Sequence, residues 1–193
     1  DAMQQGSVEC ARTLLSNGAQ ADARMHHGWT ALLVSAVGGH HECIRLLFSA
    51  SGVDVDECDV DGTSALSLAS QRGHYECVSI LLSANANPNT QRADGLSPLH
   101  YASMNGHACC VSMLLEAKAE VECRDTSDWS PLLYASYEGH LECVTKIMED
   151  GHASVDAARS TGFTPLMAAC ASGHPEVVKL LIGLKADAKV TKP

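Results

Sequence analysis

Aromatic residues are scarce in this 193-residue chain, where phenylalanine, tryptophan and tyrosine together make up 4%. Basic residues are also few: 13 lysines and arginines face 23 aspartates and glutamates, giving a formal net charge of −10. So acidic a protein repels phosphate backbones and anionic lipids, which argues against nucleic-acid or membrane-surface binding. No apolar run approaches the roughly 18 residues of a membrane span, and no basic-then-apolar leader opens the chain.

The composition is otherwise that of an ordinary folded protein, with 46% hydrophobic and 19% charged residues. The nine cysteines do not have the spacing of a disulfide framework. We therefore expect free thiols and a reducing compartment, the cytoplasm or the nucleus. Because the chain begins with Asp1 rather than methionine, we also expect it to be a fragment of a longer protein.

A Gly-His pair recurs along the chain at steps of 33 or 34 residues. The five pairs are Gly39-His40, Gly73-His74, Gly106-His107, Gly139-His140 and Gly173-His174. A leucine stands seven residues before each of these glycines, and a serine or threonine stands two residues before each leucine. Coincident positions at one period indicate an internal structural repeat.

Each repeat is predicted to contain a turn, a short helix, a second turn and a second helix. Asp61-Gly62 and Asp94-Gly95 are tight-turn signals, and the hydroxyl residue that follows can cap the next helix. Proline at the first helical position, as at Pro98, costs little. Asp128 replaces the turn glycine in one repeat, so we expect a distorted hairpin there. Because one helix pair cannot bury its apolar face alone, neighbouring repeats must stack.

Two segments, Ser97-Pro98-Leu99-His100-Tyr101-Ala102 and Thr164-Pro165-Leu166-Met167-Ala168-Ala169, resemble the Thr-Pro-Leu-His-x-Ala signature of ankyrin repeats. The resemblance covers essentially the whole chain and implies an all-α fold, an ankyrin-repeat solenoid of stacked helix-turn-helix units with short β-hairpin-like fingers. It implies a single domain over residues 1–193 that ends in a truncated C-terminal stub. The expected repeats are a partial one at 1–24 and full ones at about 25–58, 59–91, 92–124, 125–158 and 159–190.

Cysteine and histidine also recur with the repeat. One repeat position is occupied by Cys10, Cys43, Cys77, Cys110 and Cys143. Stacked repeats are about 8–10 Å apart and a disulfide needs Cα atoms within about 7 Å, so core packing is favoured over a redox or metal stripe. Cys58 and Cys123 lie in hairpins, where we expect the more exposed thiols. The Gly-His histidines are too far apart to share zinc, and we expect each ring to bond backbone in the neighbouring turn.

An acidic run before Gly62 resembles a calcium loop. However, Leu68 stands six residues after this glycine, where such a loop needs an acidic ligand. We therefore expect no metal site, and assign the run at most a role in attracting a basic partner. The sequence contains no nucleophile, phosphate-binding or zinc-protease motif. No catalytic residue, enzyme activity or cofactor is predicted.

Binding residues are expected at positions that the repeat leaves free. Two such stations, just before the recurring hydroxyl and just before the Gly-His glycine, hold four of the eight aromatic residues. Tryptophan, tyrosine and arginine often dominate binding energy; the alternative for each ring is that it only covers the base of its hairpin. The candidate partner-binding residues are Trp29, Arg72, Arg92, Leu96, Met104, Arg124, Trp129, Tyr137, Glu138 and Phe163. We expect Trp129 and Tyr137 at their centre.

The predicted function is protein–protein interaction. As a scaffold, adaptor or recognition subunit, the chain would bind a partner protein or peptide on the concave surface that the resemblance implies. The alternative is a regulatory or mechanical segment of a larger channel, transferase or signalling protein, which the full-length open reading frame would distinguish. We expect a monomer with no nucleic-acid partner and no direct insertion into a membrane.

Overall fold

The computed structural model describes residues 7–50 and 52–188, so residues 1–6 of the expected partial repeat and 189–193 of the expected stub lie outside it. Within the described ranges, eleven α-helices and one short 3₁₀ helix form. In chain order they are α1 (Val8–Ser16), η1 (His26–Gly28), α2 (Ala31–Gly38), α3 (His41–Ser49), α4 (Ala65–Arg72), α5 (Tyr75–Ser83), α6 (Pro98–Met104), α7 (Ala108–Glu116), α8 (Pro131–Tyr137), α9 (Leu141–Glu149), α10 (Pro165–Ser172) and α11 (Pro175–Gly183).

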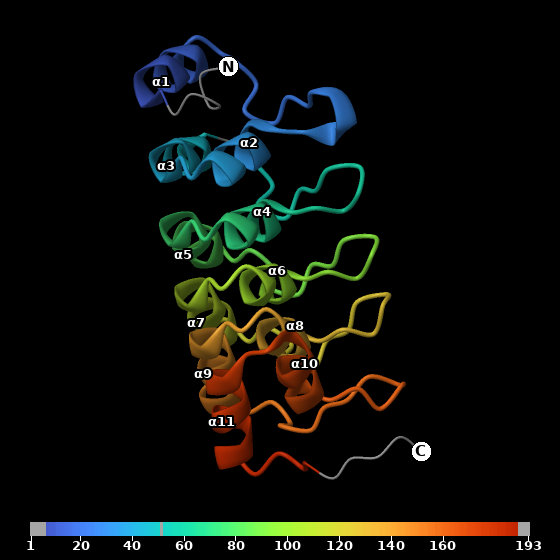
Figure 1. Cartoon of the computed structure of the whole chain (residues 1–193). Coiled ribbons are helices and arrows are strands. Elements are labelled where there is room, and N and C mark those ends of the chain that lie inside the picture. Colours follow the sequence, from blue (N-terminus) through green and yellow to red (C-terminus); the bar gives the residue numbers. More distant parts are fainter. Residues whose placement is uncertain (1–6, 51, 189–193) are drawn as a thin grey trace.

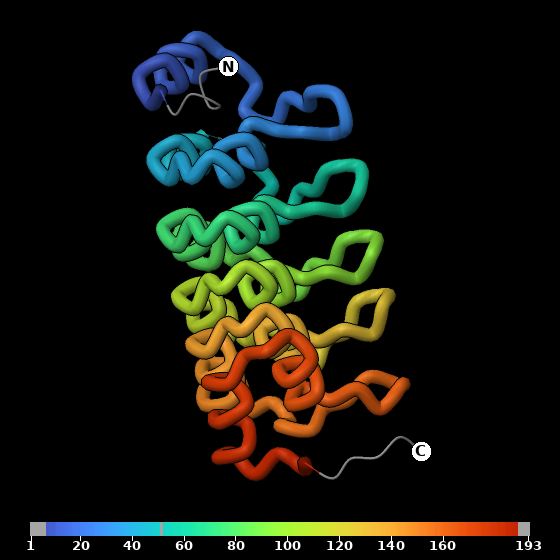
Figure 2. Tube along the Cα trace, viewed as in Figure 1, coloured from blue at the N-terminus to red at the C-terminus, as the bar shows by residue number. Residues whose placement is uncertain are grey.

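The helices form two layers, and loops that we call fingers project from one side of the stack (Figure 1). The layer nearer the fingers holds α2, α4, α6, α8 and α10, each packed against the next. Behind it, α3, α5, α7, α9 and α11 stack in the same order. The tube in Figure 2 shows one finger following another along the stack. This all-helical stack of repeats confirms the predicted fold class, with finger pairing limited to one isolated bridge between Cys58 and Ser64 among the described residues.

The first helix of each full repeat begins at the recurring hydroxyl residue. Its side-chain oxygen accepts a hydrogen bond from the backbone N–H three residues later, at distances of 3.2–3.4 Å across the five repeats. This bond satisfies one of the donors that the first turn leaves free. Proline follows the cap in α6, α8 and α10. A left-handed glycine ends α2, α4 and α10, so the repeating residues set both ends of these helices.

The core runs the length of the stack as columns of equivalent residues. The repeat leucines Leu32, Leu66, Leu99 and Leu132 are at most 2% exposed, and burying each such side chain contributes roughly 1.5–3 kcal/mol. Beside them lie four of the five cysteines that share a repeat position, all buried free thiols: Cys43, Cys77, Cys110 and Cys143. Burial raises the pKa of Cys77 and Cys110 to about 11. Core packing is therefore confirmed for these four.

The remaining thiols differ from expectation. Cys10, on α1, is exposed. The expectation that Cys58 and Cys123 are the more exposed thiols was wrong. Both lie in fingers and are half-buried, and the Cys58 thiol donates to the Asp56 carbonyl at 3.3 Å. The exposed thiols besides Cys10 lie on helices, at Cys109 and Cys170.

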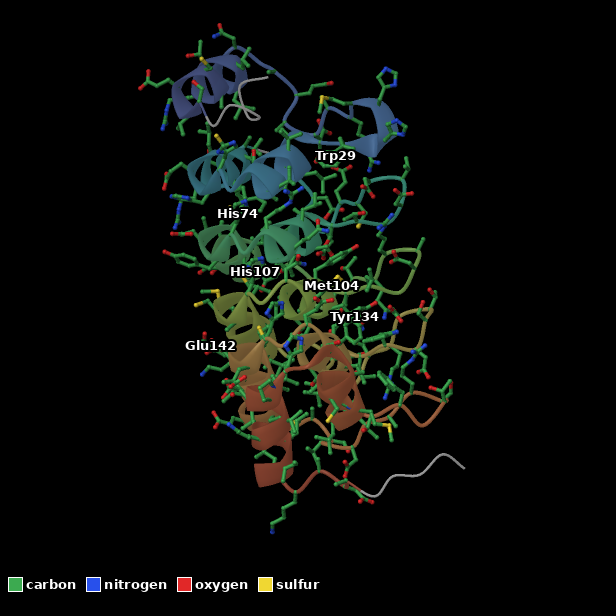
Figure 3. The ribbon with its side chains drawn as sticks, viewed as in Figure 1. Trp29, His74, Met104, His107, Tyr134 and Glu142 are labelled. Atoms are coloured by element: carbon green, nitrogen blue, oxygen red, sulfur yellow. The ribbon has the colours of Figure 1, made fainter. Side chains whose placement is uncertain are left out.

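The Gly-His pairs tie successive repeats together. In four of the five pairs, the histidine Nε2 lies 2.9–3.2 Å from a backbone carbonyl oxygen at the end of the preceding repeat's first helix. The pairs are His74 with Val37, His107 with Gln71, His140 with Met104 and His174 with Tyr137. A carbonyl only accepts, so Nε2 carries the proton and donates. Figure 3 labels two of these histidines, His74 and His107, within the helical layers of the stack. The predicted role in bonding neighbouring backbone is confirmed for these four.

Backbone hydrogen bonds also join finger to finger. The His27, Asp61 and Asp94 carbonyls accept from the N–H groups of Val60, Ala93 and Thr126, at 2.9–3.1 Å. At the next step the Asp128 carboxylate takes this role and accepts from the Ser160 N–H.

The distorted hairpin expected at Asp128 is not observed. Asp128 adopts a left-handed φ of 63°, close to the 77–83° of the equivalent glycines, and its N–H makes the same turn bond, to Asp125, at 2.9 Å. Aspartate tolerates this conformation better than most residues. The substitution therefore preserves the turn and adds a side-chain link to the next finger.

The acidic run has a structural role in its own finger. The Asp59 carboxylate accepts from the N–H groups of Asp61 and Thr63 at 3.0 and 2.8 Å, and Asp56 accepts from Asn87 of the next repeat at 2.8 Å. The same bond recurs between later repeats, where the side chains of Asn89, Glu122 and Asp156 accept from the backbone N–H groups of Glu120, Ser154 and Asp187. These side chains thus bind backbone N–H groups within a finger and between successive repeats. The described residues contain no group of three or more that could hold a metal ion.

Candidate protein-interaction surface

Four aromatic side chains gather where the finger before α8 meets the finger before α10. The ring of Trp129 stacks on Tyr134 with centroids 4.9 Å apart. It meets the edges of Tyr137 at 5.3 Å and Phe163 at 6.2 Å. These separations lie within the range of favourable aromatic pairs, each contributing about 0.5–1.5 kcal/mol beyond area burial. Trp129 is therefore the centre of a cluster that spans two repeats.

Trp129 is held by a hydrogen-bond network around Asp125. One carboxylate oxygen of Asp125 accepts from the backbone N–H of Trp129 at 2.8 Å, and the other accepts from the Tyr134 hydroxyl at 2.6 Å. Burial, followed by this bond to Asp125, raises the pKa of Tyr134, so its hydroxyl stays protonated and keeps donating. On the other side, the Trp129 carbonyl lies 3.1 Å from Nε2 of His100. The Trp129 backbone is therefore held on both sides, and its ring is stacked on Tyr134.

His100, buried in α6, links the start of its own helix to Trp129 in the next repeat. Its Nδ1 accepts from the Ser97 N–H at 3.1 Å, so Nε2 carries the proton and donates to Trp129. Burial lowers the pKa of His100. The Cys123 sulfur lies 3.7 Å from Nδ1, but burial raises the pKa of this thiol. Because Nδ1 of His100 already accepts from Ser97, it does not deprotonate the Cys123 thiol, and a protonated thiol is a poor nucleophile. Ser97 and His100 instead cap the start of α6.

A groove of about 370 Å³ opens beside the cluster. Its lining comes from two successive repeats, with Trp129 and Tyr137 on one side and residues of the next finger and α10 on the other: Arg159, Thr161, Gly162, Phe163 and Met167. The guanidinium carbon of Arg159 lies 5.2 Å from the centroid of the Trp129 ring. Tyr137 is 41% exposed, so the groove presents accessible aromatic surface beside a cation.

Comparison with known proteins agrees with this architecture. The family model for ankyrin repeats (3 copies) matches residues 1–92, 49–125 and 99–192. The chain belongs to the ankyrin-repeat family. It is similar to the crystal structure of the human ASB11 ankyrin repeat domain, with 30% sequence identity, a TM-score of 0.90 and coverage of 99% of this chain and 85% of that chain. No curated protein matches it.

Ankyrin repeats are generally protein–protein interaction modules, and the fold is typically a scaffold without catalytic activity. No helix among the described residues is long and apolar enough to cross a membrane. A protein or peptide is therefore the class of ligand that the family suggests for the groove.

The ankyrin stack brings together three of the predicted residues, Trp129, Tyr137 and Phe163. Glu138 is exposed immediately after Tyr137. The other predicted residues belong to earlier repeats, and no described ring contact joins Trp29 to the cluster. Figure 3 shows Trp29 near the first finger, with Met104 between it and Tyr134. Trp29 is partly buried against the core, Leu96 and Met104 are half-buried, and Arg72 is exposed.

Two predicted arginines make bonds within and between the ankyrin fingers. Arg92 lies 3.3 Å from a carboxylate oxygen of Asp94 and 3.7 Å from one of Asp61. Arg124 donates to the Asp128 carbonyl at 3.2 Å and pairs with its carboxylate at 3.5 Å. These contacts give both residues a structural role in the stack.

The sequence analysis did not select Arg159 and Met167, which line the groove, or Tyr134, which stacks on Trp129. Met167 occupies the repeat position of the buried His100, which favours a core assignment. Tyr134 lies inside a helix, away from the two free stations. Arg159 lies in a finger four residues before Phe163, as Arg92 lies four before Leu96. That shared spacing is the signal that could have identified Arg159.

Proposed function

We propose that this chain is a recognition module that binds a partner protein or peptide, with the groove beside Trp129 as its principal binding site. The proposal rests chiefly on the accessible groove built from Trp129, Tyr137 and Phe163 with Arg159 against it. Tryptophan, tyrosine and arginine are the residues that most often dominate interface energies. In a chain with 4% aromatic residues, this concentration in one place is best explained by binding.

Rigidity supports the same proposal. The backbone of Trp129 is held by Asp125 and His100, and its ring by Tyr134, so little conformational entropy is lost when a ligand is bound. The remaining candidates, Trp29, Arg72, Leu96, Met104 and Glu138, would extend contact along the surface beside the fingers. We further propose that the chain acts as a monomer in a reducing compartment, the cytoplasm or nucleus, in keeping with its nine free cysteines.

The test compares two exposed tyrosines. Peptides selected from a random twelve-residue display library against the chain are measured by fluorescence polarisation on Tyr137→Ala and Tyr75→Ala. Tyr137 is 41% exposed at the groove, and Tyr75 is 49% exposed at the start of α5 in the other helical layer. We expect Tyr137→Ala to weaken binding at least tenfold, about 1.4 kcal/mol, and Tyr75→Ala to leave it unchanged.

Circular dichroism on both variants confirms that each remains folded. A second groove variant, Trp129→Ala, is expected to weaken the same peptides. Peptides that bind Tyr137→Ala and Trp129→Ala as tightly as the unmodified chain would place the binding surface elsewhere, and the proposal would be wrong.

A further inference from the structure

Arg159 differs from the other arginines of the fingers. Each of the other three pairs with a carboxylate: Arg24 with Glu57, Arg92 with Asp61 and Asp94, and Arg124 with Asp128. No ion pair involves Arg159 within residues 7–50 and 52–188. In a protein of net charge −10, a finger cation without a carboxylate partner stands out, and this one lines the aromatic groove.

The position of Arg159 is fixed without neutralising its charge. Its Nη2 donates to the Ser127 carbonyl at 2.8 Å, and its guanidinium carbon lies 5.2 Å from the centroid of the Trp129 ring. Both contacts orient the guanidinium, and neither supplies an anion. Arginine bound in this way is preorganised to receive a carboxylate.

The Asp128 carboxylate near Arg159 already has other partners. It accepts from the Ser160 N–H and pairs with Arg124 at 3.5 Å. Hydrogen bonds from Ser160 are the main cause that lowers the pKa of Asp128, with smaller contributions from Arg124 and Arg159. Asp128 therefore reduces the positive potential at Arg159, but the two side chains do not form an ion pair.

The rest of the groove is suited to a bulky apolar side chain. Phe163, Met167 and Tyr137 line it together with Trp129. Two backbone amides of the finger are already bonded: the Gly162 N–H donates to the Arg159 carbonyl at 2.8 Å, and the Arg159 N–H donates to the Phe163 carbonyl at 3.0 Å. Arg159 is the charged side chain in the groove lining to which a carboxylate can bind.

We propose that the groove binds an internal segment of a partner chain in which a bulky apolar residue stands next to an aspartate or glutamate. The apolar side chain fills the space between Tyr137, Phe163 and Met167, and the carboxylate pairs with Arg159. This inference rests on the function proposed above, and it adds the chemistry of the ligand. The groove would thus bind an acidic ligand, whereas the acidic fingers would attract a basic one.

The test uses three amidated peptide display libraries that differ at one fixed residue. Each carries a varied bulky apolar residue followed by glutamate, glutamine or lysine at the centre of a random twelve-residue peptide. We expect the unmodified chain to enrich the glutamate library over the other two. Arg159→Glu is expected to reverse the preference and enrich the lysine library, because the ionic contact changes sign.

A quantitative cycle then uses the best glutamate peptide and its glutamine counterpart. On the unmodified chain the change to glutamine should weaken binding about tenfold, as expected for a charge-assisted hydrogen bond. On Arg159→Met, which keeps side-chain length against Trp129 but loses the charge, the same change should alter binding less than twofold. Arg45→Met removes an exposed arginine of α3 and serves as the matched control, expected to behave like the unmodified chain.

The outcomes separate this inference from the proposed function. Peptides that depend on Tyr137 but bind equally with glutamate or glutamine would overturn the ligand chemistry and leave the groove as the binding site. Groove-binding peptides from the first random library that lose their binding when their C-terminus is amidated would overturn the internal segment. If no selected peptide depends on Tyr137, both proposals fail. Circular dichroism of Arg159→Met and Arg159→Glu shows whether loss of the Ser127 bond alters the fold.

Discussion

Four of the Gly-His glycines leave room for a ring from the next repeat. A Cβ built on Gly39, Gly73, Gly106 or Gly139 would lie 2.3–2.8 Å from an atom of the following repeat's histidine. These glycines also have φ between 71° and 78°, where other residues are strained. Glycine is thus required twice, by its own backbone and by its neighbour. The fifth, Gly173, shares the conformation, but no atom of a residue beyond its chain neighbours lies within 4 Å of its Cβ position in the described part of the chain.

The two requirements can be separated experimentally at Gly106. Gly106→Ala should lower the free energy of unfolding by about 1–2 kcal/mol for the left-handed backbone, and by about 1–3 kcal/mol more because the new Cβ would meet the His140 ring at 2.7 Å. In a His140→Ala background only the first cost should remain. Urea denaturation of the four proteins measures both costs. Equal penalties in the two backgrounds would show that the ring does not press on the glycine.

Single residues also mark the limits of sequence reasoning. The period of the Gly-His pairs predicted both the stack and the bonds that their histidines make, because those positions repeat. Asp128 was misjudged because it departs from the repeat: the sequence shows the loss of a glycine, but not the Ser160 N–H that its carboxylate reaches. Cys58 and Cys123 were misjudged because burial between adjacent fingers depends on contacts that no single repeat contains.

At the scale of the element, α6 joins its own cap to the next finger. Ser97 and His100 form a reciprocal capping box, and the other nitrogen of the same ring donates to the Trp129 carbonyl. The bond from Ser97 requires the neutral ring, since a proton on Nδ1 would break it, whereas Nε2 donates to Trp129 in either protonation state. The cap of α6 therefore depends on the protonation state of one buried histidine.

Stability should accordingly depend on pH through His100. Its pKa is lowered in the folded chain, whereas in the unfolded chain it is about 6.5. Its contribution is therefore fully present above about pH 6.5 and is lost as the pH falls below that value. Urea denaturation between pH 7.5 and 5 should show stability falling by at most about 1.4 kcal/mol per pH unit from this group.

The matched variant is His100→Leu, which places at this position the residue found at the equivalent Leu33 and Leu133. We expect a shallower dependence on pH below 6.5 for this variant than for the unmodified chain. Parallel curves for the two proteins would assign the dependence to other histidines.

The groove was predictable in part, for a geometric reason. Residues at equivalent stations point to the same side of the stack, which identified Trp129 and Phe163. Successive repeats are roughly 10 Å apart, so only side chains of adjacent repeats can touch. Trp29 lies three repeats before Trp129, and a shared station does not bring them together. The spacing shared with Arg92 marks Arg159 as a finger arginine, but the lack of a carboxylate partner among the described residues, which distinguishes it, is visible only when the fingers are placed side by side.

At the scale of the whole molecule, each repeat is stabilised mainly by its neighbours. Inner repeats have a packed helix pair on both sides, whereas α1 packs mainly on α3. In such quasi-one-dimensional structures, local stability follows the number of occupied interfaces. Unfolding should therefore begin at α1 and reach the centre of the stack last.

Amide hydrogen exchange measured by mass spectrometry tests this order. We expect peptides from α1 to exchange fastest, and peptides from α6 and α7, at the centre of the stack, to be the most protected. Uniform protection from α1 to α7 would instead indicate that the stack opens as one cooperative unit.

The bond between Asp128 and Ser160 has a mechanical consequence. At the turn position where earlier fingers are joined by a backbone carbonyl, this pair is joined by the Asp128 carboxylate, and Arg159 adds a bond to the Ser127 carbonyl. The groove lies across the same joint, with Tyr137 on one wall and Phe163 on the other. A ligand that contacts both walls would act as a brace, so that bending the stack at this joint would take more force while the groove is occupied.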